Sequence, residues 1–373
     1  MRNIHSLLVD SYTDTYPKGV TTIEQGLAYQ PINLDISLNG QEKSFSAYRY
    51  APRVLHFKQA TLIGGRYPSI GQHLWINGAT YFADKMETPQ TVGGVTFNQI
   101  QLLAATRQHT TIFASKVILI GGRGNFGHFI FEILPRIVYL RKYLAFGYKF
   151  LVLDNFPGRF LDFCLAFGIE KESFLIVEDW ANVECTELLV SGCLVHRNPI
   201  DRRPALSLDV MYEIRDSVRK WSINSARPPT ASLTLFTSRA EERWRRVVNE
   251  EAVIRHLSNV GVPLQIFRPD QLPAQSQVDL IDSAQVHVSP IGGASPSSLF
   301  MRPNTTLVEL TTPAIDGVFA HRLWCALAGV KLERIIGKFN AECLNHGTIE
   351  ADRDFEVPPS EVTSAVLRAL QCA

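Results

Sequence analysis

Arginines that follow an apolar strand are the residues of this chain best suited to chemistry. The apolar run 233–237 leads into Ser238, and four arginines come soon afterwards: Arg239, Arg243, Arg245 and Arg246. A planar, charged guanidinium group binds phosphate oxygens in pairs. Several such groups beyond one strand end can hold a diphosphate and stabilise it as a leaving group. The alternative interpretation is a solvated basic loop paired with neighbouring glutamates.

A glycine-rich segment follows a second apolar run, 286–289. It reads SPIGGASPSS, and its candidate ligand-binding residues are Gly292, Gly293, Ala294 and Ser295. Glycines let the main chain approach a ligand closely, and N–H groups at the start of a helix attract anions. The pattern fits neither GxGxxG nor a Walker loop, which disfavours hydride transfer and ATP hydrolysis. Taken alone, the motif is explained equally well as a tight turn between packed elements.

A third motif places an imidazole just after a strand and a glycine turn. His128, Glu132 and Arg136 are spaced by four residues, so a helix presents them on one face. His128 could take a proton from an acceptor hydroxyl, and Glu132 could orient the ring or act as the base. The alternative is a polar ladder that fixes the helix to its sheet, the preferred interpretation for Glu132 and Arg136. Pro135 is expected to kink this helix.

Carboxylates elsewhere in the chain have simpler interpretations. Glu309, near the end of the apolar run 306–310, could accept the two ribose hydroxyls of a nucleotide, or be a surface acid. Asp352 and Asp354 form a DxD pair, but no apolar strand precedes them. We expect a solvated turn there and no metal site. Asn249 is expected to cap the helix that follows it.

The spacing of apolar runs predicts an α/β protein. Residues up to about 110 are β-prone and rich in turns, with a hairpin signal at Asn77-Gly78. Strands and helices then alternate, which favours a parallel sheet with helices on both faces. In the first alternating half we expect strands at 116–120, 150–153, 174–177 and 188–190, and helices at 126–143, 159–167 and 209–221. In the second half we expect strands at 233–237, 264–267, 286–289 and 306–310, and helices at 250–260, 275–283, 318–328 and 359–370.

This pattern predicts two Rossmann-like domains with additions at each end. We expect a β-rich segment at 1–114, an N-terminal Rossmann-like domain at 115–226, a C-terminal Rossmann-like domain at 227–350 and a C-terminal tail or helix at 351–373. Ligands of open α/β sheets bind at the carboxyl ends of the strands. Residues directly after strands are therefore the main site candidates.

Composition excludes several classes of protein. The 373 residues carry a formal net charge of +1, so no global field attracts nucleic acid or an anionic membrane. No apolar run approaches the roughly 20 residues of a membrane helix, and the N-terminus lacks the apolar core of a signal peptide. Six scattered cysteines without a CxxC pair indicate buried free thiols. We expect a cytoplasmic protein, with peripheral association at the inner face of the membrane left open.

The order of these motifs resembles glycosyltransferase family 61, the DUF563 or capsular-polysaccharide-biosynthesis type. The run NFGHFIFEILPRI, which begins at Asn125, resembles the N-terminal signature of that family. The run LTLFTSRAEERWRR, which begins at Leu233, resembles its strand, Ser-Arg and arginine block. The residues from Ser276 to Leu310 resemble the block that follows.

The resemblance implies a GT-B-like fold, a nucleotide-sugar donor and an inverting mechanism without a cofactor. It implies that Arg239 and Arg246 lie near the donor diphosphate, that Gly292 belongs to the donor loop, and that His128 and Glu132 lie on the acceptor side. The further acceptor-side residues of the signature are Asn125, Gly127 and Arg136. One departure is that Ile291 stands where the family commonly has histidine.

The sequence therefore favours an inverting glycosyltransferase that acts on a saccharide or lipid-linked glycan in surface polysaccharide biosynthesis. Two alternatives stay open. One is an enzyme similar to polysaccharide pyruvyltransferases, with an anionic phosphoenol donor on the same kind of basic site. The other is a degenerate transferase that binds sugar nucleotides or glycans without turnover, which the isoleucine at 291 favours. The sugar, the base, the linkage and the oligomeric state are not encoded in any motif.

Overall fold

The chain forms two compact units. The computed structural model describes residues 20–63, 67–70, 73–74, 91–92, 95–96, 111–121, 125–178, 181–197, 201, 203–222, 233–315, 319–340, 343 and 350–371. The first unit is Met1–Ile32 with Ser46–Met211, and the second is Asn33–Phe45 with Tyr212–Ala373. The expected hairpin at Asn77-Gly78 lies outside the described residues.

The first unit contains a mixed sheet built on four parallel strands. Their spatial order is β11-β10-β9-β12. Numbered along the chain this order is 3-2-1-4, the beginning of a doubly wound Rossmann sheet. The four strands are β9 (Thr111–Leu119), β10 (Lys149–Leu153), β11 (Phe174–Val177) and β12 (Asn182–Ser191). The expected strands of the first half are therefore confirmed, with longer bounds for β9 and β12.

Antiparallel strands from the N-terminal segment extend this sheet beyond β12. β4 pairs with β12, β5 and β6 follow outwards, and β1 pairs with β4. These N-terminal strands are therefore part of the first unit, whereas residues Asn33–Phe45 belong to the second. These strands are β1 (Val20–Glu24), β4 (Val54–Ile63), β5 (Tyr67–Ile70) and β6 (His73–Leu74). Further short strands are β7 (Thr91–Val92), β8 (Val95–Thr96), β13 (Val195–Arg197) and β14 (Pro204–Leu206).

A broken helix replaces the single helix expected at 126–143. Its parts are α2 (Phe126–His128), the π-helical turn η4 (Phe129–Ile133), α3 (Leu134–Leu140) and the 3₁₀ turn η5 (Arg141–Phe146). Pro135 lies in the first positions of α3, where its missing N–H and its ring disturb the ordinary i→i−4 bonding. The N–H of Leu134 donates to the carbonyl of Phe129 instead. The helix expected at 159–167 likewise divides into α4 (Gly158–Leu161) and the 3₁₀ helix η6 (Asp162–Phe167).

The second unit contains a parallel sheet with the strand order β19-β18-β17-β15-β16. Numbered along the chain this order is 5-4-3-1-2, which is the flavodoxin-like doubly wound order. β17 and β18 are buried along their whole length, as expected when helices cover both faces. The strands are β15 (Thr234–Thr237), β16 (Leu264–Phe267), β17 (Val286–Pro290), β18 (Thr306–Thr311) and β19 (Lys331–Ile336).

A long hairpin continues this sheet beyond β19, and its second strand pairs in turn with β14, which pairs with β13. It consists of β2 (Leu27–Leu38) and β3 (Gln41–Ala51), and Leu38 of β2 pairs in parallel with β19. Asn39 and Gly40 form its turn, both with positive φ, as a two-residue type I′ turn requires.

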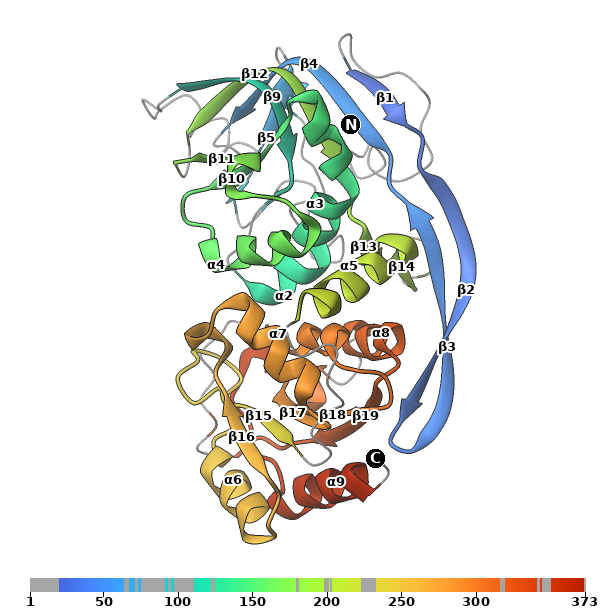
Figure 1. Ribbon diagram of the computed structural model, residues 1–373, viewed down its shortest axis with the longest axis vertical. Coiled ribbons are helices and arrows are strands. Elements are labelled where there is room, and N and C mark those ends of the chain that lie inside the picture. The colour runs from blue at the N-terminus through green and yellow to red at the C-terminus, as the bar shows by residue number, and fades with distance from the viewer. Residues whose placement is uncertain are drawn as a thin grey trace. The chain divides into compact units, whose positions relative to one another are not determined.

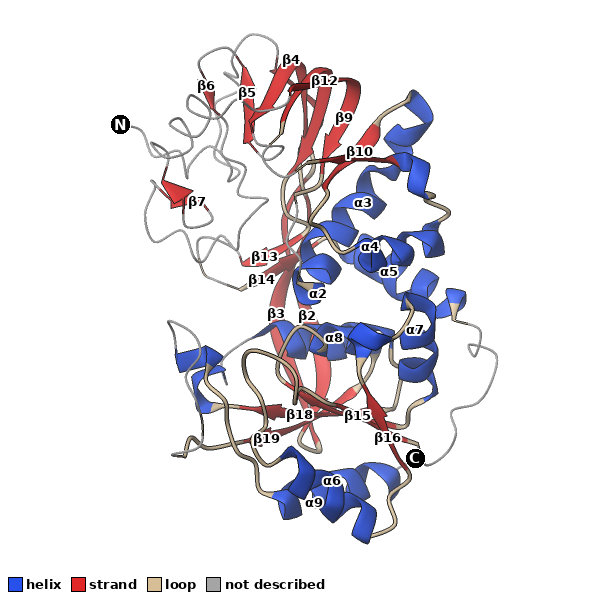
Figure 2. Ribbon diagram, turned by 90° about the vertical axis from the view of Figure 1, so that its left-hand side faces the viewer, coloured by secondary structure: helices blue, strands red, loops and turns tan. Residues whose placement is uncertain are grey.

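Helices cover both faces of the second sheet (Figures 1 and 2). α6 and α9 pack against each other on one face, while α7 and α8 lie on the other. The helices are α5 (Leu208–Trp221), α6 (Glu250–Asn259), α7 (Ala274–Ser283), α8 (Phe319–Ala328) and α9 (Pro359–Gln371). No helix in the described ranges has both the length and the apolarity needed to cross a membrane.

The C-terminal residues, expected to form a tail or helix, contain the helix α9 and belong to the core of the second unit. Phe355, Val362 and Val366 are fully buried in the same apolar cluster as Phe236 of β15 and Val288 of β17. The five cysteines within the described residues are free thiols, and four of them are buried, as expected.

We predict that Phe355→Ala lowers the free energy of unfolding of the protein by about 3–5 kcal/mol, because it leaves a cavity under the sheet. Urea denaturation measures this value. Phe113→Ala is the matched control, since the Phe113 side chain is 78% exposed, and we expect a change within about 0.5 kcal/mol. Equal effects of the two substitutions would show that the C-terminal segment is not part of this core.

Candidate functional site

The first two sequence motifs meet at the switch point of the second sheet. β15 lies between β16 and β17, so the two strands that follow it in the chain lie on its opposite sides. Ser238 and Arg239 follow β15, and Gly292 follows β17, its parallel neighbour. Doubly wound sheets bind ligands in the crevice at this point, outside the carboxyl ends of the strands.

Arg239 is a buried cation with little compensation. Only 9% of its surface is exposed, and its Nε atom has no hydrogen-bond partner. Its Nη2 donates to the main-chain carbonyl of Trp244 at 2.8 Å, and lies 3.8 Å from a carboxylate oxygen of Glu242. Burial lowers the pKa of the guanidinium group from its ordinary value, and Glu242 offsets part of that effect. Buried charges are normally paired, so this group is suited to binding an anion.

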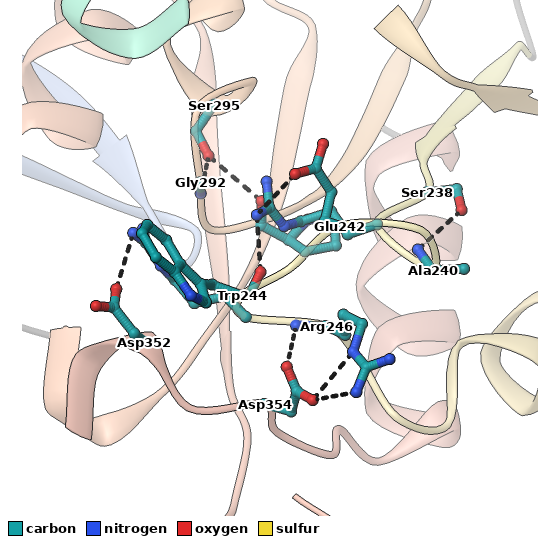
Figure 3. Close-up of polar contacts among 12 residues, drawn as sticks. Ser238, Ala240, Glu242, Trp244, Arg246, Gly292, Ser295, Asp352 and Asp354 are labelled. Atoms are coloured by element: carbon teal, nitrogen blue, oxygen red, sulfur yellow. Dashed lines mark hydrogen bonds and ion pairs between the residues drawn. The ribbon is translucent and has the colours of Figure 1, made fainter. Parts of the chain in front are cut away.

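The guanidinium group of Arg239 lies against the backbone of Gly292. A Cβ atom on residue 292 would be 2.8 Å from Cζ of Arg239, and closer still to Nη1. Real Cβ contacts are never this short, so any larger residue would force the arginine to move. Gly292 has no positive φ, and close approach is therefore the reason for glycine here. The Ser-Arg motif and the glycine loop are therefore in contact with each other (Figure 3).

A buried carboxylate fixes the start of the arginine loop. Glu250, at the start of α6, accepts from the hydroxyl of Ser238 at 2.5 Å and from the main-chain N–H of Arg239 at 3.0 Å. Glu250 therefore has a structural role. Asn249 was expected to cap α6, but its side chain makes no capping hydrogen bond. Its amide pairs instead with both main-chain groups of Val357, as a neighbouring strand would.

The DxD segment is not a solvated turn, which corrects the expectation from the sequence. Asp354 is fully buried and accepts from the main-chain N–H, Nε and Nη2 of Arg246. Asp352 accepts from Nη2 of Arg245 at 3.2 Å. Both carboxylates thereby hold the arginine loop from below (Figure 3). Because Arg246 directs Nε and Nη2 to Asp354, it is placed as a support of the loop.

Arg243 is the remaining arginine of this motif. Its side chain is exposed, and its Cζ lies 5.3 Å from the centre of the Trp244 ring. Trp244 itself is 38% exposed. Trp244 is not among the predicted site residues, although a lone aromatic residue within EERWRR is an available signal.

The glycine loop offers fewer free amides than the sequence suggested. The N–H of Gly292 donates to Oγ of Ser295 at 3.1 Å. The element after the loop is the 3₁₀ helix η9 (Ser295–Phe300), with Ala294 at its N-cap. Ile291 is buried in the apolar cluster below the sheet. Its side chain therefore contributes to packing, whereas Gly293 is partly exposed.

Glu309 is not arranged as a free acceptor for ribose hydroxyls. It lies within β18 and is fully buried. Its Oε2 accepts from Nε of Arg334 at 2.8 Å, and its Oε1 lies 2.6 Å from Nδ1 of His321. These two partners hold the pKa of the Glu309 carboxyl below its ordinary value against the effect of burial. The network ties β18 to β19 and α8.

The third motif lies at the switch point of the first sheet. Arg136 is fully buried and donates to the carbonyl of Ile120, just after β9. It also donates to the carbonyl of Gly192 and the Sγ atom of Cys193, just after β12. Arg136 therefore bridges the carboxyl ends of two adjacent parallel strands.

His128 and Glu132 form a contact on the same broken helix. Nδ1 of His128 lies 2.9 Å from Oε1 of Glu132, and the side chains are 17% and 7% exposed. Asn125 caps the helix by accepting from the main-chain N–H of His128 at 3.3 Å, and Gly127 is buried. The carboxylate can hold the imidazole in one tautomer, which leaves Nε2 as its proton acceptor.

A pocket of about 550 Å³ lies at the end of the second sheet opposite to Arg239. Its lining includes Arg219, Asp282 and Arg302, and the last two form a 2.5 Å ion pair. These residues precede β17 and β18, so the pocket is at the amino ends of the strands. It does not coincide with the site around Arg239.

Comparison with known proteins identifies one family. The family model described as Glycosyltransferase 61 matches residues 126–308. No curated protein matches the chain. Among solved structures, rubredoxin oxygen:oxidoreductase from the anaerobe Desulfovibrio gigas has 8% sequence identity and a TM-score of 0.24, over 51% of this chain and 44% of that chain. The match spans less than half of that protein, and so low a score carries no structural argument.

A buried histidine in β17, the strand that leads into the glycine loop, should make the stability of the protein depend on pH. His287 of β17 is fully buried, its Nε2 lies 2.7 Å from Oγ1 of Thr237, and burial lowers its pKa from 6.5 to about 4. Between these values the unfolded chain binds a proton that the folded protein does not. The contribution of His287 is therefore complete above pH 6.5 and is lost as the pH falls towards 4.

We predict that wild-type protein loses about 1.4 kcal/mol of unfolding free energy per pH unit in this window through His287. His287→Gln keeps a polar partner for Thr237 and removes the titration. Urea denaturation across the pH range should give a shallower slope for this variant. Parallel slopes would show that the imidazole is not buried in its neutral form.

Proposed function

Over residues 126–308 the chain belongs to the glycosyltransferase 61 family, and we propose that it is an inverting glycosyltransferase with a nucleotide-sugar donor. Membership of this family indicates glycosyltransferase activity. The acceptor in our proposal is a hydroxyl group of a saccharide or lipid-linked glycan, in surface polysaccharide synthesis at the cytoplasmic side of the membrane.

The observation that carries the proposal is the contact of Arg239 with Gly292. A buried guanidinium group with an unpartnered Nε, which lies against Gly292, supports binding of a diphosphate at the carboxyl ends of β15 and β17. The leaving group gains negative charge as the glycosidic bond to the donor breaks. A pre-positioned cation stabilises that charge without reorganisation at the moment of reaction.

In the proposed reaction an acceptor oxygen attacks the anomeric carbon in a single displacement. The new carbon–oxygen bond forms while the bond to the donor phosphate breaks, and the nucleoside diphosphate leaves with the electron pair. Nε2 of His128 takes the acceptor proton, and Glu132 stabilises the resulting imidazolium; their 2.9 Å contact supports these roles. The GT-B-like arrangement implied by the family is part of the proposal, since the acceptor must reach a donor held at Arg239.

The charges around Arg239 support a donor site that works without a metal ion. Asp352 and Asp354 direct their carboxylates to Arg245 and Arg246, so they are poorly suited to a divalent ion on the diphosphate. Glu242 approaches Arg239 at 3.8 Å and is 53% exposed at its side chain. We propose that the diphosphate replaces this carboxylate on the guanidinium group, and that Glu242 turns into solvent.

The proposal is tested with donors that differ in their leaving group. A thermal-shift screen of UDP-, GDP- and dTDP-sugars identifies the donor, because a specific ligand raises the melting temperature by mass action. CMP-sugars, which release a monophosphate, serve as the comparison. Pyruvyl transfer is the alternative hypothesis for this basic site. A melting temperature raised by phosphoenolpyruvate, and by none of the nucleotide sugars, would favour pyruvyl transfer over glycosyl transfer.

We predict that Arg239→Ala lowers kcat/KM for the identified donor by about 100- to 1,000-fold, the usual effect of removing one group that stabilises developing charge. Arg368→Ala is the matched control, because it removes the same charge from an exposed position on α9. We expect it to retain wild-type kinetics. Wild-type kinetics in Arg239→Ala, with the fold intact by circular dichroism, would contradict the proposed role of the arginine.

A further inference from the structure

An exposed tryptophan borders the place where the proposal puts the donor diphosphate. Trp244 is 38% exposed, although large aromatic side chains are usually buried. Its own carbonyl accepts from Nη2 of Arg239 at 2.8 Å. The indole is therefore attached to the same short piece of main chain that positions the proposed diphosphate-binding group.

The backbone that follows Trp244 is held in place. Arg245 has a positive φ of 58°, which is unusual for a residue with a side chain. Its N–H donates to the carbonyl of Asp352 and its Nη2 to the carboxylate of the same residue. Arg246 is bound in turn by the buried carboxylate of Asp354. These bonds keep a left-handed turn directly after Trp244 and fix the direction in which its side chain leaves the chain (Figure 3).

A cation already lies over the indole ring. Cζ of Arg243 is 5.3 Å from the ring centre, within the range of a cation–π contact. The pair thus presents an aromatic face and an exposed guanidinium group beside a buried arginine. Planar, hydrogen-bonding rings suit such a pair, because they stack on an indole while a guanidinium group binds their carbonyl oxygens.

We propose that Trp244, with Arg243, forms the platform on which the nucleobase of the donor stacks. This inference rests on the proposed function, because it assumes that Arg239 binds the diphosphate. The nucleobase of a nucleoside diphosphate is linked to the phosphates by a single ribose, so a base-stacking group must lie close to the diphosphate site. Trp244 meets this requirement through its direct bond to Arg239. A sugar ring of the acceptor, the other planar-faced occupant, has no such link to Arg239.

The test compares binding of nucleoside diphosphates with binding of inorganic pyrophosphate, which lacks a base. Isothermal titration calorimetry is carried out on wild-type protein and on Trp244→Ala, Trp244→Phe and Arg239→Ala, with UDP, GDP, ADP and dTDP as probes. The carbonyl that binds Arg239 belongs to the main chain and is retained in all Trp244 variants.

We expect Trp244→Ala to weaken the best nucleoside diphosphate by about tenfold, in the range measured when a stacking aromatic residue is removed. Pyrophosphate affinity should stay at the wild-type value, and Trp244→Phe should recover most of the loss because it keeps an aromatic face. Arg239→Ala should weaken nucleoside diphosphates and pyrophosphate alike.

The outcomes separate the two proposals. If no nucleoside diphosphate binds wild-type protein, or Arg239→Ala has no effect, the proposed function fails. If binding depends on Arg239 but Trp244→Ala leaves nucleotide affinity unchanged, the stacking proposal alone is overturned. An equal loss of pyrophosphate and nucleotide in Trp244→Ala would also overturn it, because the tryptophan would then only support Arg239. A raised KM for the acceptor with unchanged nucleotide affinity would assign the indole to the acceptor.

Discussion

The proposed site depends on the contact between the guanidinium group of Arg239 and Gly292. This guanidinium group is buried, and no carboxylate in the part of the chain that the structure describes lies in close contact with it. Other buried arginine–acid contacts in the second unit, such as Arg334 with Glu309 and Arg302 with Asp282, have close partners. The closest carboxylate oxygen to the guanidinium group of Arg239 within the described residues is that of Glu242, at 3.8 Å. Burying a charge in this way costs stability unless an anion compensates for it. The folded protein bears this cost at the switch point of a doubly wound sheet, where ligands bind.

The rest of the second unit holds this cation in position. Glu250 fixes the main chain before Arg239, and the pairs Arg245–Asp352 and Arg246–Asp354 fix the main chain after it. The last two pairs join residues about a hundred positions apart in sequence, which explains why the C-terminal segment is part of this unit. In the first unit Arg136 has a related structural task, since it bridges the ends of β9 and β12 beside His128.

The sheets could be predicted from the sequence because their strands are short apolar runs separated by amphipathic helices. β11 and β16 have the expected bounds, and the order of motifs correctly indicated the glycosyltransferase 61 family. Local patterns could not predict the π-helical turn before Pro135, which arises from a single missing N–H. The Asn39-Gly40 turn between β2 and β3 carried a hairpin signal that was overlooked.

Partners distant in sequence set the limits of prediction at the site. The proximity of Ser238, Arg239 and Gly292 follows from the expectation that residues after parallel strands meet at one edge. The burial of Asp354 does not follow, because a DxD motif in a polar stretch has the composition of a turn. Likewise, Glu309 ends an apolar run, and only the folded chain shows that Arg334 and His321 engage its two oxygens.

The affinity of the Gly292→Ala variant for a nucleoside diphosphate tests the central claim most directly. A methyl group at this position must displace the Arg239 guanidinium group, whereas Gly158→Ala, the control, places its methyl group in open space. Calorimetric titration should show at least about tenfold weaker binding for Gly292→Ala and wild-type binding for Gly158→Ala. Wild-type affinity in both variants would contradict the account, because the diphosphate would then not depend on the contact between arginine and glycine.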